Sequence, residues 1–298
     1  MRGRTVIVAL VCALGFFLPV TAPVSAAHGG DQVLFGPPED DAVQVMSFNL
    51  RFASNRLPHS WRQRRPVMAE LLRVEQPTVI GTQEGLFGQL SDIERDLPDR
   101  YAWVGQGRKG GDKDEFVAIF FDAARLKLVE YGDFWLSDTP AVAASTTWGN
   151  ETVRMATWAR FVDRRTGVEF AVVNTHLDNH SEESRVRGAA LLRERVAGFG
   201  VPVVLTGDFN AAADRSAAYD VLVRNSGLTD TWHTAAEHRS PLYATWHGYR
   251  PLEPGGARID WILTWGAVTA HAVGLNTAQH GGQFPSDHLP LQALLTFS

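Results

Sequence analysis

The chain has 298 residues, of which 45% are hydrophobic and 20% are charged, and its formal net charge is −5. This composition is that of a globular protein, and it excludes an intrinsically disordered chain, a collagen-like repeat and a coiled coil. The excess of acidic residues also argues against a protein whose main task is to grip nucleic acid nonspecifically by charge.

The first 27 residues have the pattern of a secretory signal peptide. Two arginines precede an almost wholly apolar stretch over residues 5–20, and small residues follow at 24–27. That stretch is shorter than the roughly 20 apolar residues that a membrane-spanning helix needs. We therefore expect cleavage near Ala26 or Ala27 and a secreted, extracellular protein without a stable membrane anchor. Cleavage would remove Cys12, the one cysteine of the chain, and would change the net charge from −5 to −7, because it removes two arginines and no acidic residue.

One domain is expected after this segment. Residues 28–41 are polar and rich in glycine and proline, which is typical of a short exposed lead-in. Residues 42–298 contain no Ser/Pro-rich linker, low-complexity run or internal repeat. About 270 residues suffice for a large core, so the domain does not depend on disulfides.

Short β-rich runs alternate with fewer helical stretches along this domain. We expect strands at residues 42–48, 78–82, 115–121, 126–131, 153–162, 168–175, 201–206, 258–264 and 289–297. Ser60 and Ser181 are expected N-caps of helices that end near residues 73 and 197, and a third helix is expected over 216–225. Many adjacent strands with interspersed helices indicate mixed α/β layers, and strict βαβ winding fits poorly.

Polar residues able to carry chemistry stand where these strands end. They are Asn49, Glu84, His176 with Asp178, Asp208 with Asn210, and the Ser286-Asp287-His288 segment before the last strand. Each of them alone has a plain structural explanation, such as a strand terminator or a turn. Asp260 is the exception, because it lies inside an apolar strand, where an unpaired carboxylate is costly.

Taken together, these side chains predict a metal-dependent hydrolase. Carboxylate and amide oxygens suit a hard cation such as Mg²⁺, Mn²⁺ or Ca²⁺. The zinc pattern His-Glu-x-x-His is absent, as are the Gly-x-Ser-x-Gly pattern and the phosphate-binding P-loop. A hard cation with a water-activating carboxylate and nearby histidines is a plausible set of groups for phosphate-ester hydrolysis.

Six motifs, in this order, resemble the endonuclease/exonuclease/phosphatase superfamily with its deoxyribonuclease I-like fold. They are Ser47-Phe-Asn49, Thr82-Gln-Glu84, Asn174-Thr-His176-Leu-Asp178, Gly207-Asp-Phe-Asn210, Arg258-Ile-Asp260 and Ser286-Asp-His288. The resemblance covers essentially the whole chain after the lead-in. It implies a four-layer α/β/β/α sandwich, with two central mixed β-sheets flanked by helices.

The resemblance also implies roles around a metal and a water molecule. Glu84 is expected to bind the divalent metal, with Asn49 and Asp287 helping directly or through water. Asp208 is expected to orient and deprotonate the attacking water. The number of metal ions, one or two, is left open.

Further residues are implied to act on the phosphate. Asn210 and His176 are expected to hold its oxygens and to stabilise the negative charge that builds there. His288 is expected against the scissile phosphate, held by Asp260, because a carboxylate fixes an imidazole's tautomer and raises its basicity. Asp178 follows the Thr-His-Leu pattern and is taken as a substrate contact.

Two loops are expected to distinguish this chain from its relatives. Residues 105–112 form a glycine-rich basic loop, from which Arg108 or Lys109 is expected to reach the substrate phosphate. The segment Thr245-Trp-His-Gly-Tyr249 resembles an active-site loop of family members, and Trp246 and His247 are expected to contact the substrate there.

The predicted function is a secreted, metal-dependent phosphoesterase that cleaves P–O bonds by in-line attack of water. Three substrate readings stay open: a nuclease acting on DNA or RNA, a sphingomyelinase-like phospholipase C, and a phosphatase of small sugar or inositol phosphates. A catalytically dead binding module is the alternative of another class, and the complete set of motif residues argues against it. A monomer is expected, with the phosphate-ester substrate as its partner.

Overall fold

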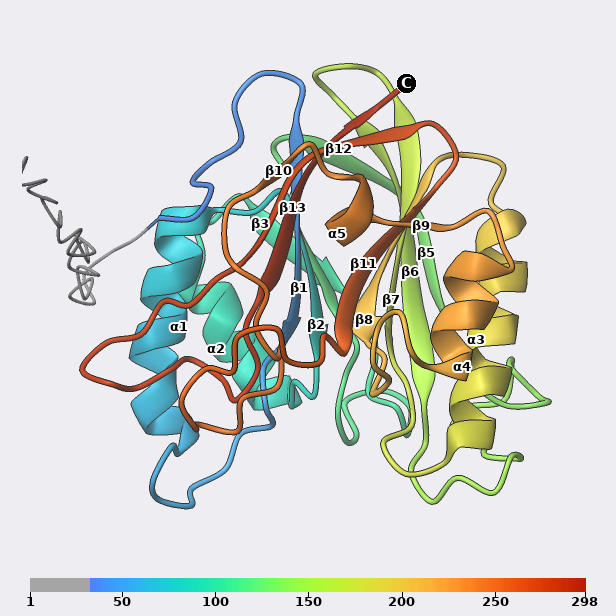
Figure 1. The fold of residues 1–298 in the computed structure, drawn as a ribbon, viewed down its shortest axis with the longest axis horizontal. Coiled ribbons are helices and arrows are strands. Elements are labelled where there is room, and N and C mark those ends of the chain that lie inside the picture. The colour runs from blue at the N-terminus through green and yellow to red at the C-terminus, as the bar shows by residue number, and fades with distance from the viewer. Residues whose placement is uncertain (1–32) are drawn as a thin grey trace, which may run out of the picture.

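The computed structural model describes residues 33–298, which form two β-sheets packed face to face between two groups of helices (Figure 1). The expected signal peptide and the first part of the expected lead-in lie outside the described residues. No helix in the described part of the chain is long and apolar enough to cross a membrane.

The first sheet has seven strands. Their order is β10 (Glu237–His238), β12 (Val268–Leu275), β13 (Leu291–Phe297), β1 (Val43–Asn49), β2 (Val79–Gln83), β4 (Ile119–Asp122) and β3 (Tyr101–Val104). In this sheet β1 runs parallel to β2 and antiparallel to β13. The start of β13 therefore lies beside the end of β1, with Leu291 paired to Ser47.

The second sheet has six strands. Their order is β5 (Leu126–Trp135), β6 (Met155–Asp163), β7 (Glu169–His176), β8 (Val203–Asp208), β11 (Asp260–Trp265) and β9 (Thr229–Asp230). Here β7 and β8 are parallel, and β11 is antiparallel to β8, with Asp260 paired to Asp208. The ends of β7 and β8 therefore meet the start of β11 at one edge of the sheet.

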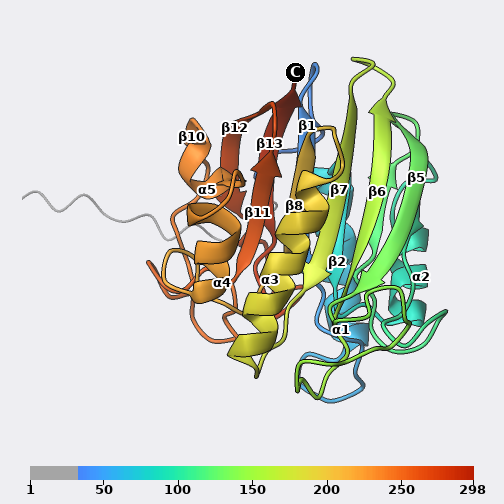
Figure 2. The same cartoon turned by 90° about the vertical axis from the view of Figure 1, so that its right-hand side faces the viewer.

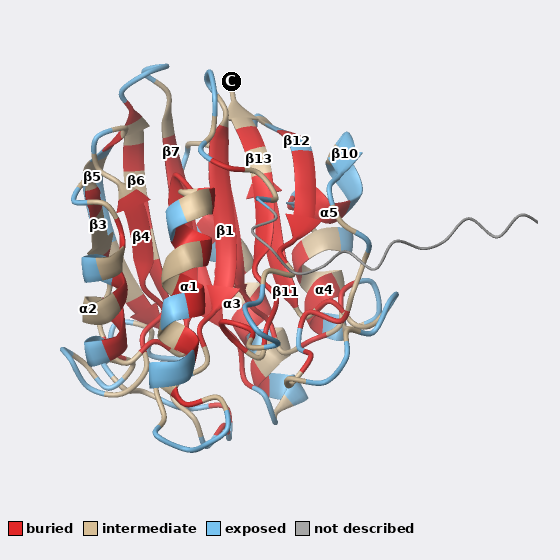
Figure 3. Ribbon diagram, turned by 90° about the vertical axis from the view of Figure 1, so that its left-hand side faces the viewer, coloured by how far each residue is buried: buried red, intermediate tan, exposed pale blue. Residues whose placement is uncertain are grey.

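Helices form the two outer layers. The outer face of the seven-stranded sheet is covered by α1 (Trp61–Glu75) and α2 (Phe87–Asp96), as Figure 3 shows. The six-stranded sheet is covered by α3 (Glu182–Ala197) and by α4 (Ala217–Tyr219), which continues as the π-helical turn η1 (Asp220–Arg224), as Figure 2 shows. The short helix α5 (Thr231–Thr234) follows β9. The expected four-layer α/β/β/α sandwich is confirmed.

Each layer boundary holds its own apolar cluster, and the strand period of two assigns side chains to them. Along β1, Val43 and Val45 pack between the sheets, whereas Met46 and Phe48 pack towards α1 and α2. A third cluster fills the space under α3 and α4. The same alternation places Asn49 on the face between the sheets, where the side chains of the second sheet also meet.

The expected strands and helices are largely present, with local differences. The strand expected over 115–121 begins only at Ile119, because Phe116 instead forms isolated bridges with Gly85 and Gly107. The third expected helix divides into α4 and η1, where the Asn225 N–H donates to the Asp220 carbonyl. The helix α2 and the strands β3 and β12 were not expected from the sequence.

Candidate active site

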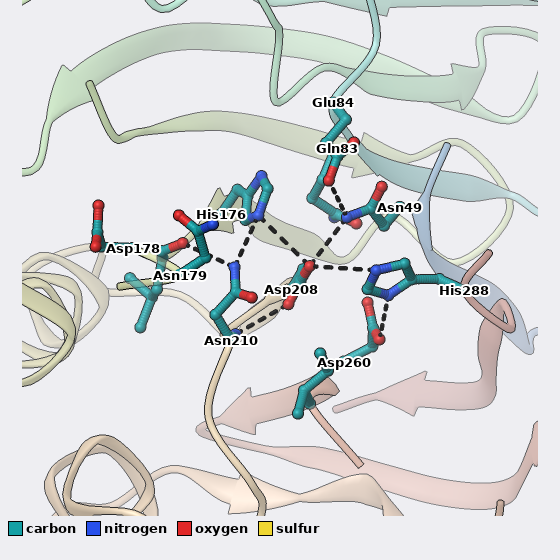
Figure 4. A network of polar contacts seen from close by, with 12 residues as sticks. Asn49, Gln83, Glu84, His176, Asp178, Asn179, Asp208, Asn210, Asp260 and His288 are labelled. Atoms are coloured by element: carbon teal, nitrogen blue, oxygen red, sulfur yellow. Dashed lines mark hydrogen bonds and ion pairs between the residues drawn. The ribbon is translucent and has the colours of Figure 1, made fainter. Parts of the chain in front are cut away.

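The polar strand ends meet at one edge of the sandwich. Asn49 ends β1, His176 ends β7 and Asp208 ends β8, while Asp260 begins β11. His288 lies three residues before β13, whose start pairs with the end of β1. The close-up in Figure 4 shows these side chains pointing towards one another across the edge between the two sheets.

Asp208 lies at the centre of the site and is 1% exposed. Its Oδ2 accepts a hydrogen bond from Asn49 Nδ2 at 2.9 Å and lies 3.4 Å from His176 Nε2 and 3.8 Å from His288 Nε2 (Figure 4). Its Oδ1 accepts from the backbone N–H of Asn210 at 2.9 Å. This bond fixes the carboxylate at the point where Asn210 turns the chain in the left-handed region, with φ 46°.

His288 is fixed by Asp260. Its Nδ1 lies 2.9 Å from Asp260 Oδ2, so its Nε2 is left to face Asp208. Burial opposes protonation of His288, but the carboxylates of Asp260 and Asp208 outweigh burial and raise the pKa of the imidazole. The buried acid expected from the sequence is thus paired with the histidine that it was expected to hold.

His176 has the opposite electrostatic surroundings. Burial, followed by the positive charge of Arg154, holds the pKa of this imidazole well below its usual value. Its Nε2 lies 2.9 Å from Asn210 Nδ2, which also donates to the Leu177 carbonyl. The surroundings of His176 therefore disfavour its protonated form, whereas those of His288 favour it.

Asp208 itself is more easily protonated than an ordinary carboxyl group. Burial, followed by repulsion from the Asp260 carboxylate, raises the pKa of Asp208, while His288 and the hydrogen bonds from Asn210 and Asn49 act in the other direction. A carboxylate with a raised pKa is a stronger proton acceptor than an ordinary one.

Glu84 and Asp208 are placed so that they could hold a cation. Glu84 Oε1 and Asp208 Oδ2 both lie about 3 Å from the same atom, Asn49 Nδ2, at 3.0 and 2.9 Å. Ligand atoms of Glu84, Asp208 and His176 lie within 4.8 Å of one another. The two carboxylates converge on one point, where the Nδ2–H group of Asn49 bridges them, and carboxylate oxygens fit a hard divalent cation.

Asp178 and Asp287 lie beside this centre. Asp178 is 2% exposed and accepts from the backbone N–H groups of His180 and Ser181 at the start of α3. Asp287 Oδ2 lies 3.8 Å from Arg51 Nε, and its carbonyl accepts from His247 N and Gly248 N. Neither carboxylate belongs to the groups of ligand atoms that converge on Asp208.

The two expected side chains of the basic loop both contact Asp114, but they differ in exposure. Arg108 pairs with Asp114 and Glu115, at 2.8 Å each, and lines a narrow cavity beside His176. Lys109 pairs with Asp114 at 2.7 Å, and its side chain is 58% exposed.

The loop over residues 245–249 pairs with the Ser286-Asp287-His288 motif. Trp246 forms a β-bridge with His288, its side chain is 47% exposed, and the Arg250 guanidinium lies 5.0 Å from the centroid of its ring. His247 is 3% exposed, and burial lowers its pKa to about 4. Trp246 is thus the exposed aromatic group beside the site, while His247 lies beneath the loop.

The sequence assigns no role to two polar residues near the site, Asn174 and Arg154. Asn174 connects the two sheets: its Nδ2 donates to the Thr82 and Ala118 carbonyls, and its Oδ1 accepts from Gln83 Nε2 at 2.7 Å. Arg154 precedes β6 and is 5% exposed. The one signal in the sequence for Arg154 is a charged residue inside the strand expected over 153–162.

Comparisons with known proteins agree with this geometry. A sequence profile of the Endonuclease/Exonuclease/phosphatase family matches residues 46–288. The chain belongs to this family. As a member, it is an enzyme of the phosphoesterase, nuclease or phosphatase type, which acts on phosphate ester bonds.

Solved structures of this family from Bacteroides thetaiotaomicron are similar over almost their whole length. One is described as an endonuclease/exonuclease/phosphatase family protein, with 32% identity, a TM-score of 0.81, and coverage of 86% of this chain and 98% of the other. A second, titled mannosyl-6-phosphatase, has 33% identity, a TM-score of 0.79, and coverage of 86% and 100%.

A curated family relative is more distant. The Drosophila melanogaster protein named "Protein angel" is 29% identical over 219 residues, which is 65% of this chain. The chain spans only 59% of the length of that relative.

Proposed function

We propose that the protein is a secreted, divalent-metal-dependent phosphatase that hydrolyses a small phosphate monoester such as a sugar phosphate. The observation that carries the proposal is the position of Asp208, whose Oδ2 faces Asn49, His176 and His288 at 2.9, 3.4 and 3.8 Å. A phosphate in this site would have a proton acceptor, an amide donor and two imidazoles within reach of its oxygens and of the attacking water.

Glu84 and Asp208, with the Asn49 amide between them, would hold the cation. When bound, a divalent cation supplies Lewis-acid stabilisation of the charge that develops on the phosphoryl oxygens. Arg51 N donates to Asn49 Oδ1, and Phe52 N donates to Glu84 Oε2, so backbone groups orient both side chains.

Asp208 would orient the attacking water and accept its proton. Its carboxylate is already fixed by the Asn210 backbone and by Asn49, so it needs little rearrangement before the reaction. A positioned general base of this kind contributes about 10²- to 10⁴-fold to a rate.

His288, Asn210 and His176 would hold the phosphoryl oxygens. His288 is oriented by Asp260, and Asn210 and His176 contact each other at 2.9 Å. Donors fixed before the reaction stabilise developing negative charge without a reorganisation cost, and each contributes a few kcal/mol, about 3.

The small-monoester substrate is supported by two facts. The Bacteroides structure titled mannosyl-6-phosphatase is 33% identical to this chain over 86% of its length. The chain has a formal net charge of −5, and an acidic protein repels a polyanion such as DNA or RNA at long range.

The test is a substrate panel assayed with and without EDTA, using wild type and Asp208→Asn. The panel holds mannose 6-phosphate, glucose 6-phosphate, plasmid DNA, single-stranded DNA, RNA and sphingomyelin. We expect EDTA-sensitive release of phosphate from the sugar phosphates and a fall of about 10³-fold in kcat for Asp208→Asn, the middle of the range for a lost general base. Activity confined to nucleic acid or sphingomyelin would overturn the monoester proposal, and full activity in EDTA would overturn the metal requirement.

Export is a separate part of the proposal. It is supported by the basic, apolar and small-residue segments within residues 1–27. Expression of the full chain in a bacterial host should yield an extracytoplasmic protein whose N-terminus begins after Ala26 or Ala27. An uncleaved protein retained in the cytoplasm would contradict it.

A further inference from the structure

A second polar centre adjoins His176 on the side away from Asp208. In the six-stranded sheet β7 lies between β6 and β8, so His176 at the end of β7 has Asp208 on one side and the start of β6 on the other. Arg154 directly precedes β6, and the Met155 carbonyl accepts a hydrogen bond from Thr175 Oγ1. This places the arginine beside the histidine.

Arg154 is a buried cation whose donors are incompletely used. Its side chain is 5% exposed, its Nη2 donates to Asn179 Oδ1 at 2.9 Å, and its Nε lies 3.8 Å from Asp178 Oδ2. That Nε has no hydrogen-bond partner among residues 33–298. A buried guanidinium with a free N–H is costly unless another acceptor completes it.

Arg108 reaches the same place from the loop over residues 105–115. Arg108 Nη1 donates to Glu115 Oε2 at 2.8 Å, and Trp135 Nε1 donates to the Arg108 carbonyl at 2.7 Å. The loop is therefore fixed to β5, and the arginine is held in position before any ligand arrives.

The two arginines and His176 line one narrow cavity of about 10 Å³. That volume admits about one water-sized group. Burial, followed by the positive charge of Arg108, lowers the pKa of Arg154, as expected for two cations held close together. Arg108 has two carboxylates at 2.8 Å, those of Asp114 and Glu115, whereas the Asp178 carboxylate lies 3.8 Å from Arg154 Nε, so Arg154 is the less compensated of the two arginines.

We propose that Arg154 and Arg108 form a subsite that takes one oxygen of the substrate's phosphoryl group and makes the enzyme prefer phosphomonoesters to phosphodiesters. The proposal rests on the function proposed above and specifies which phosphate esters the site accepts. A monoester carries about −1.5 to −2 charge near pH 7 and three free oxygens, and arginine binds such oxygens strongly. A diester has less charge, and its second organic group is larger than the cavity beside His176.

The experiment compares Arg154→Gln with wild type on 4-nitrophenyl phosphate and bis(4-nitrophenyl) phosphate, with Mg²⁺ present. Loss of a charge-assisted contact should lower kcat/KM for the monoester by about 10- to 100-fold. The value for the diester should change less than about 3-fold, which is under 0.7 kcal/mol. The ratio of monoester to diester activity therefore falls. An equal fall for both esters, or no fall, would overturn the subsite.

Arg160→Gln is the matched control. Arg160 lies on the same strand β6, pairs with Glu169 at 2.5 Å and has a 30% exposed side chain. Its substitution should leave both kcat/KM values unchanged. Should Arg154→Gln not fold, as judged by its melting curve, Arg108→Gln tests the same subsite from the loop, and we expect the ratio to fall in the same direction. An unchanged ratio in Arg108→Gln would then overturn the proposal.

A binding measurement separates this proposal from the proposed function. Inorganic phosphate is titrated calorimetrically into Mg²⁺-loaded wild type and Arg154→Gln. The dissociation constant should rise about 10-fold or more in the variant, as loss of a charge-assisted hydrogen bond predicts. If wild type hydrolyses no phosphate ester but shows this difference, the subsite stands and the proposed function fails. Equal dissociation constants would overturn the subsite whatever the activity.

Discussion

At the scale of single residues, the buried carboxylate of Asp260 has one hydrogen-bonding side-chain partner among residues 33–298, the imidazole of His288. Its Oδ2 lies 2.9 Å from His288 Nδ1, and its Oδ1 has no hydrogen-bond partner in the described part of the chain. Because burying this carboxylate is costly, an asparagine of the same size would serve folding about as well. An asparagine would not carry the negative charge that holds the imidazole of His288.

Asp260→Asn should therefore reduce catalysis more than stability. The asparagine keeps the size of the side chain, and the Asp260 N–H, which is bonded to Thr245 Oγ1, is unaffected. We expect kcat to fall about 10- to 100-fold, the usual effect of losing a carboxylate that orients a histidine, with the melting temperature within about 3 °C of wild type. Steady-state kinetics and a thermal melt check both values.

Asp163→Asn is the matching control, because Asp163 is a buried carboxylate that pairs with Arg125 at 2.8 Å near the opposite end of β6. It should lower the melting temperature and leave kcat unchanged at temperatures where the protein is folded. A kcat of wild-type size in Asp260→Asn would show that His288 does not depend on its acid.

At the scale of elements, Arg64 joins helix α1 to the loops that carry the site. It is fully buried and donates five hydrogen bonds of 2.6–3.2 Å to the backbone carbonyls of Leu50, Arg51, Phe52, His59 and Pro285. The first three of these follow β1, and the last precedes the Ser286-Asp287-His288 motif. Ser286 Oγ also donates to the Asn49 carbonyl at 2.7 Å, so the two loops are held together directly.

Arg64→Met should disrupt this junction. Several carbonyls would lose a charged donor, and the free energy of unfolding should fall by about 3 kcal/mol or more, since hydrogen bonds to charged groups contribute roughly 1.5–3 kcal/mol each. Chemical denaturation measures the change. Arg62→Met, two residues earlier at an exposed position of the same helix, should change stability by less than about 0.5 kcal/mol. Equal unfolding curves for the two variants would refute the role of Arg64.

The elements that the sequence predicted are those with strong local signals. The strands that carry Asn49, His176 and Asp208 are short apolar runs that end in polar motifs, and the period of two then fixes the face of each side chain. The sequence does not predict helix α2, because Leu86 occupies its N-cap and Gly88 lies in its first turn. The sequence does not predict strand β12, because its run is interrupted by His271 and Gly274 and it contains a bulge between Ala270 and Ala272.

The residues of the site also divide into those that the sequence predicts and those that it does not. Residues at strand ends were predictable, because adjacent parallel strands bring their ends together whatever the loops do. The cavity of Arg154 and Arg108 was not, since one arginine precedes β6 and the other lies on a loop more than 40 residues earlier in the chain. Only tertiary packing brings these two charges to one point.

At the scale of the whole molecule, the site depends on how closely the two sheets approach each other. Directly behind it, the Asn174 and Thr206 side chains of the six-stranded sheet contact each other at 3.0 Å and face Gly81 of β2 in the seven-stranded sheet. Thr206 lies two residues before Asp208, and Asn174 lies two residues before His176. The spacing of the sheets at Gly81 therefore sets the positions of two residues of the site.

Gly81→Ala should change that spacing. A methyl group at residue 81 would overlap Thr206 Oγ1 and lie 2.7 Å from Asn174 Oδ1, and both neighbours are fully buried. Overpacking of this kind costs about 1–3 kcal/mol. In a domain of this size that corresponds to a drop of about 3–10 °C in melting temperature. Because Asp208 and His176 would shift with their strands, kcat should fall as well, by about 10-fold or more.

Gly88→Ala is the opposite case on the same chain. A methyl group at Gly88 meets no atom within 4 Å, and Gly88 lies in helix α2, where alanine is favoured over glycine by about 1 kcal/mol. Its melting temperature should rise slightly, and its kcat should stay unchanged. If Gly81→Ala behaved like Gly88→Ala in both calorimetry and kinetics, the sheets would not be in the contact that positions the site. A loss of stability without a loss of kcat would show that the strain stays in the core and that the geometry of the site does not depend on the sheet spacing.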